Sequence, residues 1–229
     1  MRVNVLAHTP EAKRVAFAAV RTCYSPNVPS ELYAAEFDEY ESKRVVESQS
    51  TNEINFIPDS DRLLRQIASH GHTSTLEHVV FTFSIEGITR ACLAQLTRHR
   101  IASYSVQSQR YVKQSTDSKH GCFDFDTPNF SYCNAPSEAT EIFEDMMGQI
   151  QDAYDKLILL GVKAEDARAL LPNAATTNVV MTMNLRSLIH FYKIRNKETH
   201  AQAEIAELAE HLKNAVVLYE PWTEYFFNL

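Results

Sequence analysis

The strands and helices predicted from this sequence do not alternate regularly, and this order restricts the fold more than any other feature. Alternating apolar residues predict short strands at residues 1–8, 78–88 and 176–184, set among segments with helical periodicity. A parallel sheet of βαβ units would need strands and helices to alternate along the chain. The sequence therefore predicts an α+β fold, and 229 residues are consistent with a single domain over residues 1–229.

Capping and stop signals predict where the helices begin and end. The predicted helices run from Thr9 to about Cys23, Leu32 to about Val46, Asp59 or Ser60 to His70, Thr89 to His99, Ala139 to Gly161, a short one stopped by Pro172, one capped by Asn184, and a last one over residues 200–219. In the middle strand, Val79, Phe81 and Phe83 should share one face. A polar connection is predicted over residues 47–60 and a long loop over residues 114–137.

Glycine is scarce, and this excludes two common nucleotide-binding turns. The chain has five glycines, and no two are spaced as G-x-G-x-x-G or G-x-x-x-x-G-K requires. A bound nucleotide would therefore be held by arginines and helix ends.

Positive charge is concentrated in one short stretch of an acidic chain. The formal net charge is −7, yet RHRIASYSVQSQRY, residues 98–111, places Arg98, Arg100 and Arg110 around His99. Nucleic-acid binding needs a broad basic surface, so the cluster favours a local site for a small anion. A nucleic-acid-binding module that uses the same cluster is an alternative. If the segment is extended, Arg98 and Arg100 lie on one face and His99 on the other.

Other arginines occur where a solvated surface charge is less expected. Arg168 lies between apolar residues near a helix end, and Arg186 and His190 share a helix face that does not include Arg195. Taken together, these residues predict two anionic ligands that approach from different sides.

The segment HGHTSTLEH, residues 70–78, is rich in histidine. His70, His72 and His78 do not have the H-E-x-x-H spacing, so no metal is predicted, although a metal-dependent hydrolase is a further alternative. A loop that hydrogen-bonds a small molecule through Ser74 and Glu77 fits the composition better.

Cysteine usage and hydropathy indicate the compartment. The four cysteines form no C-x-x-C pair, which is typical of reduced thiols. No apolar run approaches the roughly 20 residues that cross a bilayer, and the N-terminus lacks the order of a secretory signal. We expect a cytoplasmic protein that binds neither membrane nor nucleic acid.

Five segments, in order, resemble the flavin-dependent thymidylate synthases. They are RTCYS, HGHTSTLEHVVFTF, RHRIASYSVQSQRY, RALLP and NLRSLIHFYKIRNKETHAQAEI, spread over most of the chain. The resemblance implies an antiparallel or mixed sheet wrapped by helices, and a homotetramer with shared active sites where subunits meet. It also implies conversion of dUMP to dTMP, with FAD as cofactor and NADPH and 5,10-methylenetetrahydrofolate as co-substrates.

The resemblance also implies the site residues. Those that match FAD contacts are His72, Ser74, Glu77, Arg98, His99, Arg100, Ile101, Asn184, Arg186, His190 and His200. Those that match dUMP contacts are Gln95, Arg98, Ser108, Gln109, Arg110, Arg168 and Arg195. Arginine suits both anionic ligands because it offers fixed charge and paired donors.

The family's scheme needs no enzyme nucleophile. None of the four cysteines follows a proline, unlike the nucleophile of the folate-only thymidylate synthases, and Ser108 is expected to position substrate. Arg195 is expected to stabilise negative charge on the pyrimidine carbonyls. Cys23, Gln109 and His190 differ from some relatives, and one extra residue separates Arg195 from His200.

Overall fold

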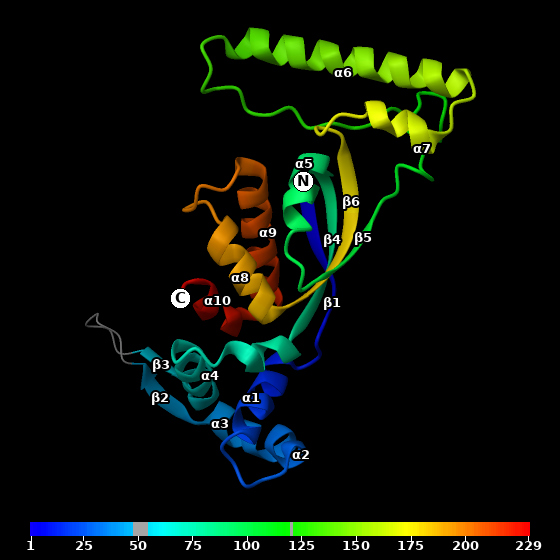
Figure 1. Ribbon diagram of the computed structural model, residues 1–229. Helices are drawn as coiled ribbons and strands as arrows, with labels where there is room; N and C mark the ends of the chain where they lie inside the picture. The colour runs from blue at the N-terminus through cyan, green and yellow to red at the C-terminus, as the bar shows by residue number, and fades with distance from the viewer. Residues whose placement is uncertain (48–54, 120) are drawn as a thin grey trace. The chain divides into compact units, whose positions relative to one another are not determined.

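The structure is a computed structural model that describes residues 1–47, 55–119 and 121–229. Its strands are β1 (Arg2–His8), β2 (Arg44–Glu47), β3 (Asn55–Pro58), β4 (Val80–Thr89), β5 (Ser103–Val106) and β6 (Thr176–Asn184). Its α-helices are α1 (Ala12–Thr22), α2 (Pro29–Glu31), α3 (Phe37–Ser42), α4 (Asp59–Ser69), α5 (Arg90–Leu96), α6 (Pro136–Leu159), α7 (Ala164–Ala167), α8 (Leu185–Arg195), α9 (Ala203–Tyr219) and α10 (Glu224–Phe227). A π-helical turn η1 (Leu32–Glu36) and the 3-10 turns η2 (Thr73–His78), η3 (Arg168–Leu170) and η4 (Pro221–Thr223) complete the described elements. The α+β prediction is confirmed (Figure 1).

Four of the strands form one antiparallel sheet in the order β1-β4-β6-β5. Thr82, early in β4, lies opposite Thr182, late in β6, with 3.0 Å between their hydroxyl oxygens. The end of β5 meets the start of β6, where the Gln107 amide donates to the Asn178 carbonyl at 2.9 Å. Of the two predicted arrangements, antiparallel and mixed, the structure has the antiparallel one. β2 and β3 form a separate antiparallel pair.

The described residues divide into two compact units, each assembled from separate segments. Unit 1 comprises Met1–Arg2, Ile85–His99 and Tyr104–Val180, and unit 2 comprises Val3–Ser84, Arg100–Ser103 and Met181–Leu229. The division falls inside β4 and inside β6, and the single-domain boundary stays a prediction. No helix in the described part of the chain is long and apolar enough to span a membrane.

The core of unit 2 contains the apolar face predicted for the middle strand. Val79, Phe81 and Phe83 are all completely buried. α8 and α9 lie side by side in this unit (Figure 1), and each contributes buried leucines, such as Leu188 and Leu208. Because the leucine-bearing side of α8 is buried against the core, the opposite side of this helix is exposed.

Unit 1 contains the predicted long loop, which is held against α6. The side chain of Gln151 in α6 donates to the Gln114 carbonyl at 2.9 Å and accepts from the Phe123 amide at 3.0 Å. Phe123 packs in a small core with Met147 and Ala175. α6 lies beside α7 (Figure 1) and ends as predicted, with Gly161 in a left-handed conformation at φ 85°.

The start of α1 differs from the prediction. The helix begins at Ala12, after Glu11 in a left-handed conformation. Thr9 instead fastens the end of β1 to β4, since its amide donates to the Val80 carbonyl and its hydroxyl accepts from the Val80 amide, both at 2.9 Å. This tertiary pairing overrides the preference of threonine for a helix cap.

One predicted cap and one further predicted boundary are wrong. α4 begins at Asp59, as expected, but Pro58 occupies the N-cap position and no side chain caps the helix. The Asp59 carboxylate instead accepts from Arg62 at 2.5 Å. The charged helix expected to reach Val46 ends at Ser42, because residues 44–47 pair with residues 55–58 as strands. The rest of that predicted connection, residues 48–54, lies outside the described residues.

Candidate functional site

The residues predicted to bind cofactor and substrate occur in both units. Unit 2 holds His72, Ser74, Glu77, Arg100, Ile101, Asn184, Arg186, His190, Arg195 and His200. Unit 1 holds Gln95, Arg98, His99, Ser108, Gln109, Arg110 and Arg168.

In unit 2, the histidine-rich segment forms η2, which packs against α8. Gly71, at φ 83°, lets the chain turn out of α4, and the next amide, that of His72, donates to the Ile67 carbonyl at 3.1 Å. Within η2, Leu76 is buried, whereas Ser74 is exposed. The turn therefore anchors itself by one apolar side chain and presents its polar ones.

α8 begins at a side-chain cap, as the sequence predicts. The Asn184 side-chain oxygen accepts from the Ser187 amide at 2.8 Å, and the Leu185 amide donates to the Val79 carbonyl at 2.8 Å. These bonds set the rotation of the helix, with Leu185 buried and Arg186 exposed.

An ion pair joins the two predicted cofactor segments within unit 2. The Arg186 guanidinium contacts the Glu77 carboxylate, although 109 residues separate them in sequence. Their side chains are 50% and 44% exposed, and pairs of this kind contribute about 1 kcal/mol or less. Both groups can therefore exchange this contact for a ligand at low cost.

The remaining predicted residues of α8 and the segment after it are partly or fully accessible. His190 and His200 are exposed, and Arg195 is half-buried at the end of the helix. Arg100 and Ile101 are exposed, and the side chain of Ile101 is 72% accessible. An apolar side chain left this open is available to contact a ligand or a second chain.

In unit 1, Arg98 and His99 lie in a turn and not in the extended segment that the sequence analysis considered. The amide of Arg98 donates to the Gln95 carbonyl at 3.3 Å, and that of His99 to the Leu96 carbonyl at 3.1 Å. The turn closes the end of α5, which begins at Arg90 and is capped by Thr89, whose side chain accepts from the Cys92 amide. Arg98 and His99 therefore do not alternate across a strand, as they would if the segment were extended.

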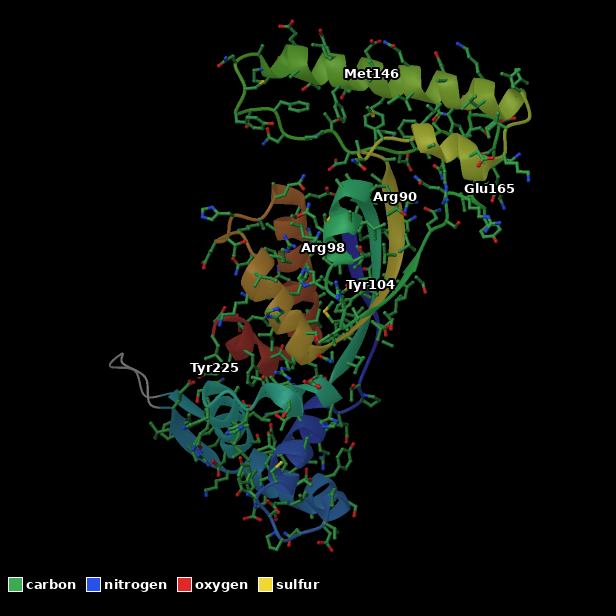
Figure 2. The ribbon with its side chains drawn as sticks, viewed as in Figure 1. Arg90, Arg98, Tyr104, Met146, Glu165 and Tyr225 are labelled. Atoms are coloured by element: carbon green, nitrogen blue, oxygen red, sulfur yellow. The ribbon has the colours of Figure 1, made fainter. Side chains whose placement is uncertain are left out.

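Tyr104 holds this turn in place, a role that no sequence signal indicated. Its hydroxyl lies 3.0 Å from the Leu96 carbonyl oxygen and 2.8 Å from that of His99. Burial raises the pKa of Tyr104 to about 12, so the hydroxyl remains a hydrogen-bond donor. Figure 2 shows Tyr104 and Arg98 in this unit.

The end of β5 carries the second basic segment. Ser108 begins a turn in which its hydroxyl oxygen accepts from the Arg110 amide at 3.2 Å and its carbonyl from the Val112 amide at 2.9 Å. Gln109, between them, is half-buried. The turn directs Arg110 toward α7.

Glu165 in α7 contacts two of the arginines that are predicted to bind dUMP, Arg110 and Arg168. Its carboxylate oxygen lies 2.6 Å from Nε of Arg110, and its carbonyl accepts from Nε of Arg168 at 3.0 Å. Arg168 is exposed and begins η3. The sequence analysis did not identify Glu165, because its partners are distant in sequence or are main-chain atoms.

Arg90 is a second residue that the sequence analysis missed. It starts α5, and its Nη2 donates to the Gln107 carbonyl at 3.3 Å. Burial lowers the pKa of Arg90, and the positive charge of Arg168 lowers it further. The structure thus brings these two arginines within electrostatic range of each other.

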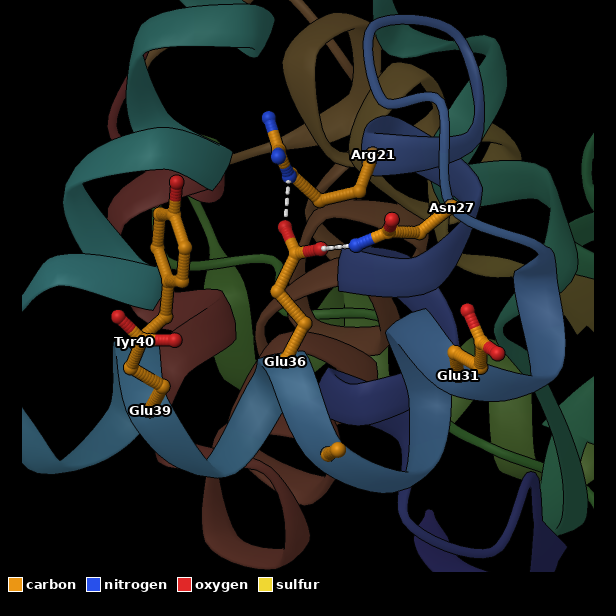
Figure 3. Close-up of a pocket in the computed structure, with 7 residues that line it drawn as sticks. Arg21, Asn27, Glu31, Glu36, Glu39 and Tyr40 are labelled. Atoms are coloured by element: carbon orange, nitrogen blue, oxygen red, sulfur yellow. Dashed lines mark hydrogen bonds and ion pairs between the residues drawn. The ribbon is translucent and has the colours of Figure 1, made fainter.

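A hollow of about 520 Å³ in unit 2 contains the arginine of the RTCYS segment (Figure 3). There Arg21 pairs with Glu36, and the Asn27 side chain donates to the other oxygen of the same carboxylate at 3.1 Å. These polar groups satisfy one another, so Arg21 joins α1 to η1 and Asn27 joins the segment after α1 to the same residue of η1.

Comparison with known proteins gives one consistent family. The family described as "Thymidylate synthase complementing protein" matches residues 4–222. A flavin-dependent thymidylate synthase of Geobacter sulfurreducens is 41% identical over 216 residues, which cover 94% of this chain and 82% of that protein. Another from Nitratidesulfovibrio vulgaris is 38% identical, covering 91% and 79%.

A solved structure shares the fold. The UMP/dUMP methylase PolB from Streptomyces cacaoi, bound to 5-Br dUMP, superposes with a TM-score of 0.74 and covers 99% of this chain and 94% of its own. Its sequence identity is 19%, so the likeness concerns architecture alone.

Proposed function

Because the chain belongs to the family of flavin-dependent thymidylate synthases, we propose that it converts dUMP to dTMP, with 5,10-methylenetetrahydrofolate as one-carbon donor and NADPH-reduced FAD as hydride source. The observation that carries this proposal is the family match over residues 4–222. A homotetramer with shared active sites is part of the same proposal. So is a cytoplasmic location.

The donor groups of unit 2 fit a flavin nucleotide. FAD carries a diphosphate and several hydroxyl groups, which need charged and neutral hydrogen-bond partners. The face made by η2 and α8 presents Ser74, Glu77, Arg186 and His190, and its ion pair is exposed enough to open for a ligand. We assign to FAD the exposed unit 2 residues His72, Ser74, Glu77, Arg100, Ile101, Arg186, His190 and His200, together with the half-buried Asn184. The family resemblance adds Arg98 and His99 of unit 1 to this assignment.

Asn184 has a constrained part in this assignment. Its side-chain oxygen is engaged by the Ser187 amide, so the NH₂ group is the end that offers donors to a cofactor. Reduced FAD, when bound, supplies the hydride of the reaction.

The basic groups of unit 1 fit the nucleotide substrate. Arg110 and Arg168 offer guanidinium donors for the phosphate of dUMP, and Glu165 holds both side chains. The other residues assigned to dUMP are Gln95, Arg98, Ser108, Gln109 and Arg195.

Ser108 and Arg195 have different roles in the proposed chemistry. The Ser108 hydroxyl oxygen accepts from the Arg110 amide. Among the described residues, no histidine or carboxylate contacts this hydroxyl to activate it as a nucleophile. Ser108 therefore positions the substrate. Arg195 stabilises negative charge on the pyrimidine carbonyls, as a fixed cation beside a developing oxyanion does.

The test is dTMP formation by the purified protein given dUMP, 5,10-methylenetetrahydrofolate, NADPH and FAD, measured by mass spectrometry. A parallel reaction omits FAD after the protein has been stripped of flavin. Product that depends on FAD is the expected result. Absence of product from protein that demonstrably contains FAD contradicts the proposal.

A further inference from the structure

The segment between α8 and α9 connects two residues with different proposed roles. Arg195 ends α8 and is assigned to the pyrimidine of dUMP, whereas His200, which precedes α9, is assigned to FAD. Both residues lie in unit 2. The residues between them, 196–199, include the one extra residue noted in the sequence. The conformation of this short segment therefore decides how far the substrate contact lies from the cofactor contact.

Contacts between α8 and α9 hold the end of α8 in place. In the last turns of α8, the Tyr192 hydroxyl donates to the Glu210 carboxylate of α9 at 3.1 Å. The Lys213 side chain, also in α9, donates to the same hydroxyl oxygen at 3.3 Å. Because these bonds tie α8 to α9, the connection between the two helices must span a fixed gap. Its internal hydrogen bonds then decide its shape.

Asn196 begins a closed turn at the end of α8. It leaves the helical conformation at φ −67° and ψ 172°, and its amide donates to the Tyr192 carbonyl at 2.9 Å. Its carbonyl accepts from the Thr199 amide at 3.1 Å, and its side-chain oxygen accepts from the Glu198 amide at 2.9 Å. Asparagine favours the first position of such a turn because its side chain bonds the backbone two residues later. The turn thus accommodates the extra residue of this connection.

Thr199 closes the turn immediately before His200. Its hydroxyl donates to the Asn196 carbonyl at 2.8 Å and accepts from the Ala201 amide at 3.3 Å. These two bonds hold the main chain on both sides of His200. The side chains of Asn196 and Thr199 are half-buried, whereas Lys197, in the middle of the turn, is exposed. The side-chain bonds that shape the turn therefore come from its first and last residues.

We propose that Asn196 and Thr199 are positioning residues that set the separation between Arg195 and His200, and so align the pyrimidine of dUMP with the flavin. This inference rests on the proposed function and adds two residues that the family resemblance did not include. Both act through their neighbours, since Arg195 and His200 are the residues assigned to the ligands. Affinity and rate fall with the fraction of molecules in which such contacts have the productive geometry.

The test measures FAD affinity and turnover in Thr199→Val, because valine has the shape of threonine without its hydroxyl. Loss of both hydroxyl bonds should raise Kd for FAD about fivefold, measured by quenching of flavin fluorescence, and should lower kcat about tenfold at saturating FAD and dUMP. Thr199→Ser keeps the hydroxyl and should bring both values to within about twofold of wild type.

A second pair of variants tests the other end of the turn. Asn196→Ala should show the same two losses, and Asn196→Ser, whose hydroxyl bonds the backbone more weakly, should recover part of both. Ser42→Ala is the matched control, since the Ser42 hydroxyl also bonds the carbonyl three residues earlier, that of Glu39 at 2.9 Å, at the end of α3. Its FAD affinity and kcat should equal those of wild type.

Unchanged kcat of FAD-saturated Thr199→Val overturns the proposal, even if stability toward urea falls, because the turn would then only support the fold. A lower kcat with unchanged FAD affinity also overturns it, since the effect would not reach His200. If Thr199→Val does not fold, the same criteria are applied to Asn196→Ala. Weaker FAD binding by these variants of a protein that makes no dTMP contradicts the proposed reaction and leaves the positioning of the cofactor contact standing.

Discussion

The Glu165 carboxylate oxygen lies 2.6 Å from Nε of Arg110, and the carbonyl of the same glutamate accepts from Arg168 at 3.0 Å. One residue of α7 therefore orients two guanidinium groups that we assign to the phosphate of dUMP. Figure 2 shows Glu165 and Arg90 in the same unit. Because the carboxylate engages the Nε side of Arg110, the outer NH₂ groups remain for a second anion.

Removing this carboxylate should weaken substrate binding. Arg110 and Glu165 are 55% and 33% exposed, so the ion pair is worth about 1 kcal/mol or less, and Glu165→Ala should raise KM for dUMP by about fivefold or less with kcat little changed. Glu165→Gln, which keeps a hydrogen-bond acceptor, should restore most of the loss. Asp166→Ala, an exposed neighbour on α7, is the steady-state kinetic control. A lower KM in Glu165→Ala would show that the carboxylate competes with phosphate instead.

Arg195→Ala should preserve FAD content and folding but lower kcat by about 100-fold or more, the effect of losing a group that stabilises developing charge. Flavin absorbance reports the FAD content, and single-turnover dTMP formation reports the chemical step. Lys193→Ala removes an exposed positive charge from the same helix and should leave turnover unchanged. Wild-type turnover in Arg195→Ala would exclude the assigned role.

Arg186→Gln should weaken FAD binding, because it removes a cation from the face made by η2 and α8. A charge-assisted hydrogen bond to the cofactor implies a rise in Kd for FAD of about tenfold, measured by quenching of flavin fluorescence. Arg44→Gln, an exposed arginine on β2, is the control. Equal FAD affinity in Arg186→Gln and wild type would place the cofactor elsewhere.

Tyr104→Phe should destabilise the turn that carries Arg98 and His99. Loss of the hydroxyl leaves two carbonyl oxygens without this donor and should cost about 1–3 kcal/mol of unfolding free energy, measured with urea at neutral pH. Tyr132→Phe, at a side chain that is 83% exposed, should cost nothing measurable. Equal stability of Tyr104→Phe and wild type would refute the role of this hydroxyl.

The same tyrosine predicts a dependence on alkaline pH. Burial raises the pKa of Tyr104 from 10.0 to about 12, so the unfolded chain loses this proton at lower pH than the folded protein. The stability contributed by the neutral hydroxyl is therefore complete below pH 10 and is lost as pH rises toward 12. Urea unfolding at pH 8 and pH 11 should show a larger loss for wild type than for Tyr104→Phe. Parallel losses in both proteins would contradict this assignment.

Local sequence patterns predicted the parts of the fold that depend on neighbouring residues. β6 has the predicted bounds, Thr176–Asn184, and Asn184 caps α8, because alternation and capping act within a few residues. The predicted boundaries are wrong where contacts with distant residues decide the structure. Thr9 bonds to β4 instead of capping a helix, and residues 44–47 pair with residues 55–58 as strands, although the helix from Leu32 was expected to reach Val46.

The sequence by itself determined the α+β class and the order of the family motifs, since each follows from residue type and spacing, and the resemblance of those motifs implied the proposed ligand-binding residues. Only the tertiary structure revealed Glu165, Tyr104 and Arg90 as partners of those residues. Arg90 meets Gln107 across 17 residues, and Glu77 meets Arg186 across 109. Such contacts form when burial of the apolar faces brings remote segments together, and no local pattern of charge or hydropathy records which partners will meet.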